Sequence, residues 1–169
     1  MSHLAGADDW SARSVMIREA VPGDATAMSE MLQELIAAGQ RASRGDVTFV
    51  RLHYIEHPYR LHCLLAEDED GTILGFQSLK CAHDGNPYDT PTGWGIIGTH
   101  IRPSAARRGV GSQLFAETLS AAGTSQLPAI EAYISDENEP ALGYYESLGF
   151  RTRRSSDGIV RKVYELKPP

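Results

Sequence analysis

The sequence predicts an α/β or α+β domain in which a mixed sheet packs against helices. Its 169 residues are the length of one ordinary domain, and 41% hydrophobic with 22% charged residues is typical of soluble globular proteins. Strand-like and helix-like patterns alternate along the chain: strand, helix, loop, three strands, helix, strand, helix and two strands. We expect one domain over residues 14–169. Residues 1–13 mix small and charged types without periodicity and predict a flexible extension.

The first half of the domain predicts a strand, a helix and a hairpin. A short strand is followed by Asp24, which is placed to cap the first helix. The apolar face of that helix consists of Met28, Met31, Leu32, Leu35 and Ile36. Residues 40–59 predict an irregular loop or a short helix. Residues 60–82 contain two apolar runs separated by an acidic turn, which is the pattern of a β-hairpin.

The second half alternates strands and helices. Residues 94–101 predict a strand with glycines in and beside it at positions 93, 95 and 98, which indicate a bulge or a close approach of another group. A helix follows to about Ala122, then a strand over residues 128–135. The next helix ends at Gly149, a residue type common at helix C-termini. Two strands complete the chain.

The charge and the cysteine count exclude several classes of protein. Sixteen basic and twenty-two acidic residues give a net charge of −6, so we expect no binding to nucleic acid and none to membranes. No apolar run approaches the length of a membrane span, and the first residues lack a secretory signal, so we expect a cytoplasmic protein. Cys63 and Cys81 are too few for a disulfide framework, and no zinc-site spacing occurs; we expect no metal.

The segment from Arg107 to Ser112 carries the strongest local signal. A dinucleotide fingerprint needs a third glycine where Leu114 stands, and an ATP-binding loop needs a lysine that is absent. The third interpretation is a phosphate cradle, because a strand end, a glycine turn and a helix start present several N–H groups with no acceptor. A glycine turn that only packs the helix on the sheet is the structural alternative.

Two motifs of this chain resemble those of the GNAT superfamily of N-acyltransferases. The segment Ile101–Gly111, "IRPSAARRGVG", is similar to the acyl-CoA-binding motif of the family, with Ala106 where the family prefers Gln or Arg. The segment Asn138–Phe150, "NEPALGYYESLGF", is similar to the closing pattern NxxAxxxYxxxGF. The first strand and helix fit the family as well, so the resemblance extends from Val15 to the end of the chain.

The resemblance implies the GNAT fold and acetyl-CoA as cosubstrate. That fold is a mixed, mostly antiparallel central sheet, splayed at the fourth strand and flanked by helices. The splayed strand would bind the pantetheine arm as an added strand would, and the glycine turn would hold the pyrophosphate through main-chain N–H groups. The implied cofactor-binding residues are Ile101, Arg107, Arg108, Gly109, Val110, Gly111, Ser112 and Asn138. For Asn138, a helix N-cap is the structural alternative.

Acetyl transfer to an amine requires an acid for the leaving thiolate and removal of a proton from the amine. Tyr145 matches the family tyrosine and is the predicted acid, because a phenol is protonated at neutral pH; a packing aromatic is the alternative. Tyr144 is predicted to be a core residue. Relatives carry a carboxylate base where this chain has Ile97 and Gly98. His100 is the predicted base.

Other candidates for removing the amine proton are Glu131, His62 and a water chain without a dedicated base. The alternative for His100 is a core or surface histidine. The acceptor would be bound by the first helix and by residues 40–59 and 84–93, and the acidic balance favours a cationic small molecule.

The sequence therefore predicts an N-acetyltransferase that moves acetyl from acetyl-CoA to a primary amine of a small molecule, by direct attack in a ternary complex. Two alternatives stay open: a protein or peptide N-acetyltransferase, and a domain that senses acyl-CoA without turnover. Because relatives are often dimers, the resemblance also implies a homodimer.

Overall fold

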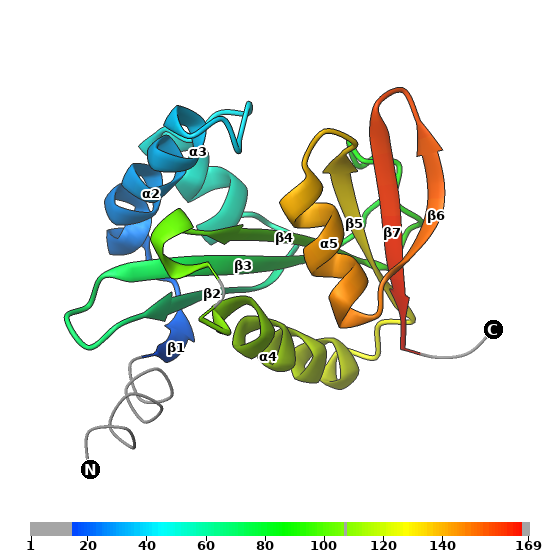
Figure 1. The fold of residues 1–169 in the computed structure, drawn as a ribbon. Helices are drawn as coiled ribbons and strands as arrows, with labels where there is room; N and C mark the ends of the chain where they lie inside the picture. The colour runs from blue at the N-terminus through cyan, green and yellow to red at the C-terminus, as the bar shows by residue number, and fades with distance from the viewer. Residues whose placement is uncertain (1–14, 107, 167–169) are drawn as a thin grey trace, which may run out of the picture.

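A seven-stranded sheet forms the centre of the computed structural model, which describes residues 15–106 and 108–166 (Figure 1). The strand order is β1-β2-β3-β4-β5-β7-β6. The strands are β1 Met16–Glu19, β2 Arg60–Glu67, β3 Ile73–Cys81, β4 Gly95–Ile101, β5 Ala129–Ser135, β6 Arg151–Ser156 and β7 Ile159–Glu165. All neighbours pair antiparallel except β4 and β5. The predicted mixed, mostly antiparallel sheet is confirmed; the predicted extension over residues 1–13 lies outside the described residues.

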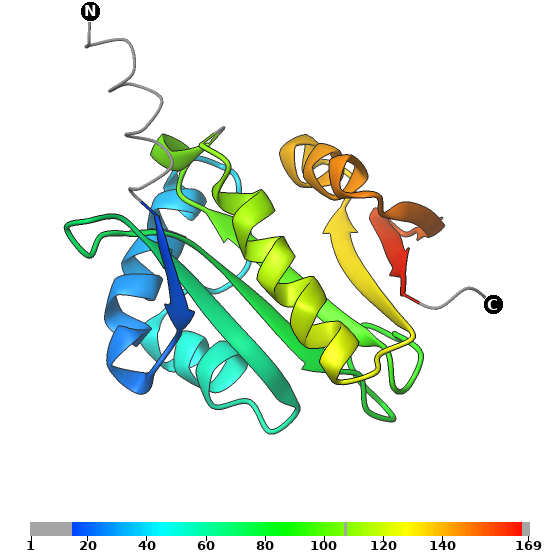
Figure 2. The same ribbon diagram turned by 90° about the horizontal axis from the view of Figure 1, so that it is seen from below.

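Helices cover both faces of the sheet (Figures 1 and 2). The longer ones are α2 Ala25–Ala37, α4 Val110–Thr124 and α5 Glu139–Leu148; the shorter ones are α3 Val47–Val50, the π-helix η2 Arg51–Ile55, and the single turns η1 Pro22–Asp24 and η3 Pro103–Ala105. Alternation along β2 shows the two sides: Cys63 and Leu65 pack with α2, whereas Leu64 and Ala66 pack with α4. The predicted order of strands and helices is confirmed.

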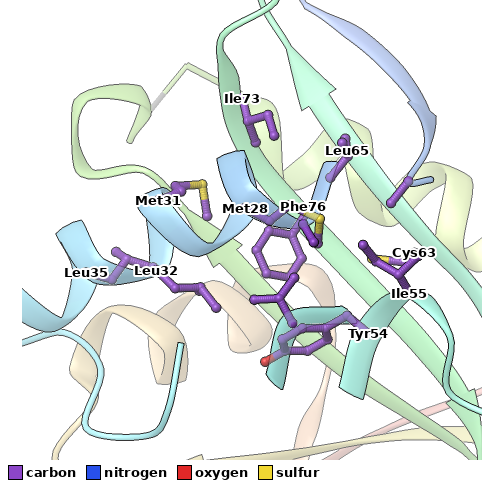
Figure 3. Close-up of a cluster of buried hydrophobic side chains, with 13 residues drawn as sticks. Met28, Met31, Leu32, Leu35, Tyr54, Ile55, Cys63, Leu65, Ile73 and Phe76 are labelled. Carbon is purple, nitrogen blue, oxygen red and sulfur yellow. The ribbon is translucent and has the colours of Figure 1, made fainter. Parts of the chain in front are cut away.

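The core on the α2 side is a continuous apolar cluster (Figure 3). Met28, Met31 and Leu32 of α2 are fully buried against Phe76 of β3. Tyr54 and Ile55 of η2 close the cluster. Residues 47–55 therefore form two short helices, as one of the two expectations for this segment had it, and the rest of residues 40–59 is irregular. Val50, Tyr54 and Ile55 bury the helical part.

Strands β4 and β5 diverge after a short parallel ladder, as Figure 2 shows. Their pairing runs from Gly95↔Ile130 to Ile97↔Ala132. Beyond it, β4 continues to Ile101 paired with β3 alone, and β5 continues to Ser135 paired with β7 alone. The predicted splay at the fourth strand is confirmed. The ladder between β3 and β4 has no register shift, so the bulge expected at the splay is absent from that ladder.

One predicted cap is wrong. The Asp24 side chain makes no capping bond to α2; its carboxylate accepts from the Val21 N–H at 2.8 Å and from Arg18 at 2.8 and 2.9 Å. Asp24 stabilises the preceding turn instead, because a nearby guanidinium competes for its oxygens. In the described part of the chain, no helix has the length and apolar composition needed to cross a bilayer.

Candidate active site

The N-terminus of α4 follows the end of β4 after the single turn η3, beyond the point at which β4 leaves β5. Gly109 is the N-cap, with φ of +78°, a left-handed conformation that favours glycine. By helix geometry, the first-turn N–H groups from Gly109 to Ser112 have no acceptor within the helix. The Arg108 N–H donates to Ala105 O at 3.3 Å, so this N–H is used within the turn. Arg107 lies outside the described residues.

Helix α5 reaches across to this turn through Tyr144. The Tyr144 hydroxyl donates to the Gly111 carbonyl at 2.8 Å. A Cβ at position 111 would lie 2.6 Å from Tyr144 Cε1, closer than real contacts, so glycine is needed there. Tyr144 packs against the second apolar cluster as predicted, but the sequence did not indicate its polar contact with the turn.

Thr99 of β4 is the centre of a neutral hydrogen-bond network. The Tyr145 hydroxyl donates to Thr99 Oγ1 at 2.8 Å. Gln77 of β3 donates from Nε2 to Thr99 Oγ1 and to the Tyr144 hydroxyl, each at 3.0 Å. Because Thr99 Oγ1 accepts two bonds, its own hydrogen can only be donated, and the Tyr144 hydroxyl is one acceptor for it. The buried Gln77 Oε1 has no hydrogen-bond partner among the described residues.

Both tyrosines keep their protons at neutral pH. Burial raises the pKa of Tyr144 to about 12, although hydrogen bonds from Gln77 and Thr99 oppose the shift. Burial raises the pKa of Tyr145 further, and this side chain is only 4% exposed. The site on this face therefore consists of neutral donors and acceptors.

Asn138 caps α5 beside the diverging end of β5. Its Oδ1 accepts from the Ala141 N–H at 3.2 Å. The structural alternative for Asn138, a helix N-cap, is thus present, and its contact with a cofactor stays a prediction.

The predicted base His100 points away from the predicted acid. Consecutive strand residues face opposite sides, so Thr99 faces Tyr145 while His100 contacts Tyr54 and Phe76 on the other face. His100 Nε2 lies 3.1 Å from the Tyr54 hydroxyl. Part of the ring is accessible, yet desolvation and nearby cations lower its pKa to about 3. Such a ring is a weak proton acceptor, which argues against the base role.

The other two candidate bases are engaged elsewhere. Glu131 is buried, accepts from Thr90 at 2.8 Å and pairs with Arg153 at 2.7 Å, so it is part of a closed ionic cluster. His62 is on β2, and its Nε2 lies 3.0 Å from Thr118 Oγ1 of α4. Strands β3 and β4 stand between β2 and the splay. Neither lies in the Thr99 network.

Sequence reasoning missed Thr99, Gln77 and Lys80. Thr99 and Gln77 pair across the β3–β4 ladder, and Lys80 pairs with Ile96 in the same ladder. The signal that could have found them is a polar residue inside an apolar strand, since a buried polar side chain needs a partner. The hairpin prediction alone did not give the register that joins them to β4.

The fold and motifs place the chain in a known family. A model of the acetyltransferase (GNAT) family matches residues 28–150, more than half of the chain. The chain therefore belongs to the GNAT acetyltransferase family. Mycothiol acetyltransferase of Thermomonospora curvata is 34% identical over 108 residues, covering 63% of this chain and 32% of that protein. A second mycothiol acetyltransferase, from Clavibacter michiganensis, is 34% identical over 88 residues, 52% of this chain and 26% of that protein. The chain thus spans about a third or less of the length of these relatives.

Solved structures agree with the fold. A GCN5-related N-acetyltransferase from Kribbella flavida superposes with a TM-score of 0.75 at 22% identity, covering 92% of this chain and 99% of that one. A GNAT family acetyltransferase from Brucella melitensis, solved in complex with acetyl-CoA, gives a TM-score of 0.68 at 19% identity and covers 92% of this chain and 90% of that one.

Proposed function

We propose that this protein transfers acetyl from acetyl-CoA to a primary amine of a small molecule. The observation that carries the proposal is the splay of β4 from β5. Tyr145 of α5 donates to Thr99 of β4 at this splay, and the N-terminus of α4 lies close to the same network. The named activities of the GNAT relatives support the same reaction class.

The residues present fit acetyl-CoA. Residues 98–101 of β4 have no strand partner on the β5 side, so their outward backbone groups suit an extended amide-containing arm. The N–H groups from Gly109 to Ser112 suit the pyrophosphate, and Asn138 would contact the arm beside β5. Acetyl-CoA supplies the activated acyl group and a thiolate leaving group.

Tyr145 is the proposed acid. It holds a proton at Oη and donates a hydrogen bond to Thr99 Oγ1. Rotation of the Thr99 hydroxyl from Tyr144 toward the splay would make the two hydroxyls of Tyr145 and Thr99 a short route for a proton to a sulfur beside β4. Such acid assistance contributes roughly 10² to 10⁴ in rate.

Amine deprotonation is proposed to use solvent rather than a dedicated side chain. An amine with a pKa near 10.4 is neutral in about one molecule in a thousand at pH 7. The pKa of about 3 argues against His100, and the ion pairs of Glu131 argue against that carboxylate. Arg41, the charged neighbour with the largest effect on His100, favours the neutral form of an amine bound near it.

Incubation with acetyl-CoA and a panel of amines, with detection of free thiol, tests the proposal. Thiol release that depends on a small amine is the expected result. Acetyl-CoA binding without thiol release on any amine would favour a sensor, and release only with peptides would favour a peptide acetyltransferase.

A further inference from the structure

A lysine is buried on the face of the sheet opposite the Tyr145 network. Lys80 of β3 is 5% exposed. It pairs with Ile96 of β4, one residue before the last β4–β5 pair at Ile97. Lys80 therefore lies on the sheet within one residue of the point where the splay opens.

Among the described residues, a neutral ring nitrogen and an aromatic face are the contacts of the Lys80 ammonium. Its Nζ lies 3.2 Å from His53 Nε2 and 5.5 Å from the centre of the Tyr54 ring. The Tyr88 hydroxyl is 3.3 Å from the same His53 nitrogen. Among the residues that the structure describes, no carboxylate forms an ion pair with Lys80.

Several carboxylates on the neighbouring segments already have partners. Glu131 of β5 pairs with Arg153 and Asp89 with Arg154, and Asp84 accepts from the Thr92 hydroxyl at 2.6 Å. A buried ammonium without an anion is unfavourable, and a ligand that brings a negative charge removes this penalty.

Lys80 lines a small pocket. The pocket has a volume of about 80 Å³, and its lining combines polar side chains with Cys81, Pro87 and Ile96. The polar side chains are His53, His57, Lys80, His83, Asn86 and Tyr88. Since one water molecule needs about 10–15 Å³ of such space, there is room for a group the size of a carboxylate.

The pocket is positive although the chain is negative overall. Desolvation lowers the pKa of Lys80 to about 8, so the ammonium is charged in most molecules at pH 7. Desolvation and the Lys80 charge lower the pKa of His53 to about 3, so this ring is neutral and accepts from Lys80. Arg41, 3.4 Å from the Tyr54 hydroxyl, adds a second cation.

We propose that this pocket binds a carboxylate of the acceptor, so that the acceptor is an amine that also carries a carboxylate. This inference rests on the proposed acetyl transfer. The Lys80–Ile96 pair and the Ser78–Gly98 pair lie on one face, two residues apart, or about 7 Å. A small molecule spans that distance, with its carboxylate on Lys80 and its amine at the splay. The net charge of the chain favoured a cationic acceptor, but Lys80 and Arg41 would repel an acceptor that carries only positive charge. We therefore propose an acceptor with a carboxylate in place of a purely cationic one.

Matched acceptors test the inference. Each pair consists of an amino acid and the amine that lacks its carboxylate, and kcat/KM is measured by thiol release. We expect the wild type to prefer the carboxylate acceptor at least tenfold, since a hydrogen bond between charged groups is worth about that much. Lys80→Met should bring the ratio close to one by lowering kcat/KM for the carboxylate acceptor alone. Lys80→Arg should keep part of the preference.

Lys162→Met is the matched control. Lys162 is also buried, at 6% exposure, but pairs with Glu146 on the β7 side. It should leave the ratio unchanged. Thermal unfolding of each variant shows whether it is folded.

Each other outcome decides a separate question. An equal or greater preference for the plain amine, or a ratio that Lys80→Met leaves unchanged, overturns the carboxylate pocket while acetyl transfer stands. If no acceptor releases thiol, the proposed function fails, and the pocket is then decided by thermal stabilisation with the same acceptor pairs. Stabilisation by the amino acid but not by the amine, lost in Lys80→Met, supports it; equal stabilisation rejects it.

Discussion

Thr99 and His100 are neighbours on β4, yet they belong to different chemical environments. Thr99 meets a tyrosine hydroxyl and a glutamine amide, all uncharged. His100 meets Tyr54 on the face where Lys80 and Arg41 supply positive charge. One strand thus separates a neutral face suited to proton donation from a cationic face suited to recognition of an anion.

The separation has a physical reason. A proton donor for sulfur must keep its proton, which burial among neutral groups ensures for Tyr145. Recognition of a carboxylate needs a charge that stays in place, which Lys80 provides from a strand. Successive side chains of a strand face opposite sides of the sheet. Proton donation and carboxylate recognition can therefore lie on opposite faces of β4 at neighbouring residues. Substitutions on one face should therefore change one function and spare the other.

Tyr145→Phe should have the largest effect. Loss of the hydroxyl removes the donor to Thr99, so kcat should fall roughly 10² to 10⁴-fold. Acetyl-CoA affinity, measured by calorimetry, should stay within a few-fold, because Phe keeps the ring in the cluster.

Tyr164→Phe is the control for that substitution, since its ring packs against Phe115 and Phe150 in the same cluster. It should leave kcat unchanged. A Tyr145→Phe variant with wild-type kcat would exclude the acid role.

Glu131→Gln should mainly reduce stability. The carboxylate is fully buried and pairs with Arg153, so removing its charge leaves a guanidinium without its anion at a cost of about 3 kcal/mol. Urea unfolding should show this loss, while kcat of the folded enzyme and its pH profile stay the same. Glu165→Gln, at the exposed end of β7, should cost little. Loss of the acidic limb of the pH profile in Glu131→Gln would instead identify this residue as the base, because a base must be deprotonated to act.

Gly111→Ala tests the contact between the two helices of the neutral face. The added Cβ would lie 2.6 Å from Tyr144 Cε1, so the ring must move and its bond to the Gly111 carbonyl weakens. We expect a loss of about 1–3 kcal/mol in the free energy of unfolding and weaker binding of acetyl-CoA. Gly123→Ala in the same helix, where a Cβ meets nothing within 4 Å, should instead stabilise by up to about 1 kcal/mol. Equal effects would show that the crowding at Tyr144 is unimportant.

Much of the fold follows from the sequence because its signals are local. The periodicity around Met28, the turn at Asp70 and the Gly149 cap each depend on a few neighbouring residues, and the structure confirms a helix, a hairpin and a helix end there. The two spaced motifs then give the order of elements around the splay. Asp24 shows the limit, because Arg18 takes the carboxylate that was expected to cap α2.

The candidate site was less predictable because its contacts are not local. Gln77 meets Tyr144 across 67 positions, and Lys80 meets His53 across 27. Residue type alone placed His100 as a base, and only the packing around it reveals a pKa of about 3. The pKa of a buried histidine depends on which groups exclude water from its ring, and these groups are known only once the chain is folded.

Two histidines on the His100 face should make the stability of the protein depend on pH. His53 and His100 keep pKa values of about 3, below the ordinary 6.5, because desolvation disfavours their charged forms. Between these values the unfolded chain binds protons that the folded protein does not, so the free energy of unfolding falls as pH drops from 6.5 toward 3. The fall is up to roughly 1.4 kcal/mol per pH unit for each ring.

Urea unfolding at pH 4, 5, 6 and 7 measures this dependence of the unfolding free energy on pH. His100→Gln should make the dependence shallower by about one proton, whereas Tyr145→Phe, which removes no group that titrates in this range, should leave the slope unchanged. An unchanged slope in His100→Gln would mean that His100 is protonated in the folded protein, and the argument against it as a base would no longer hold.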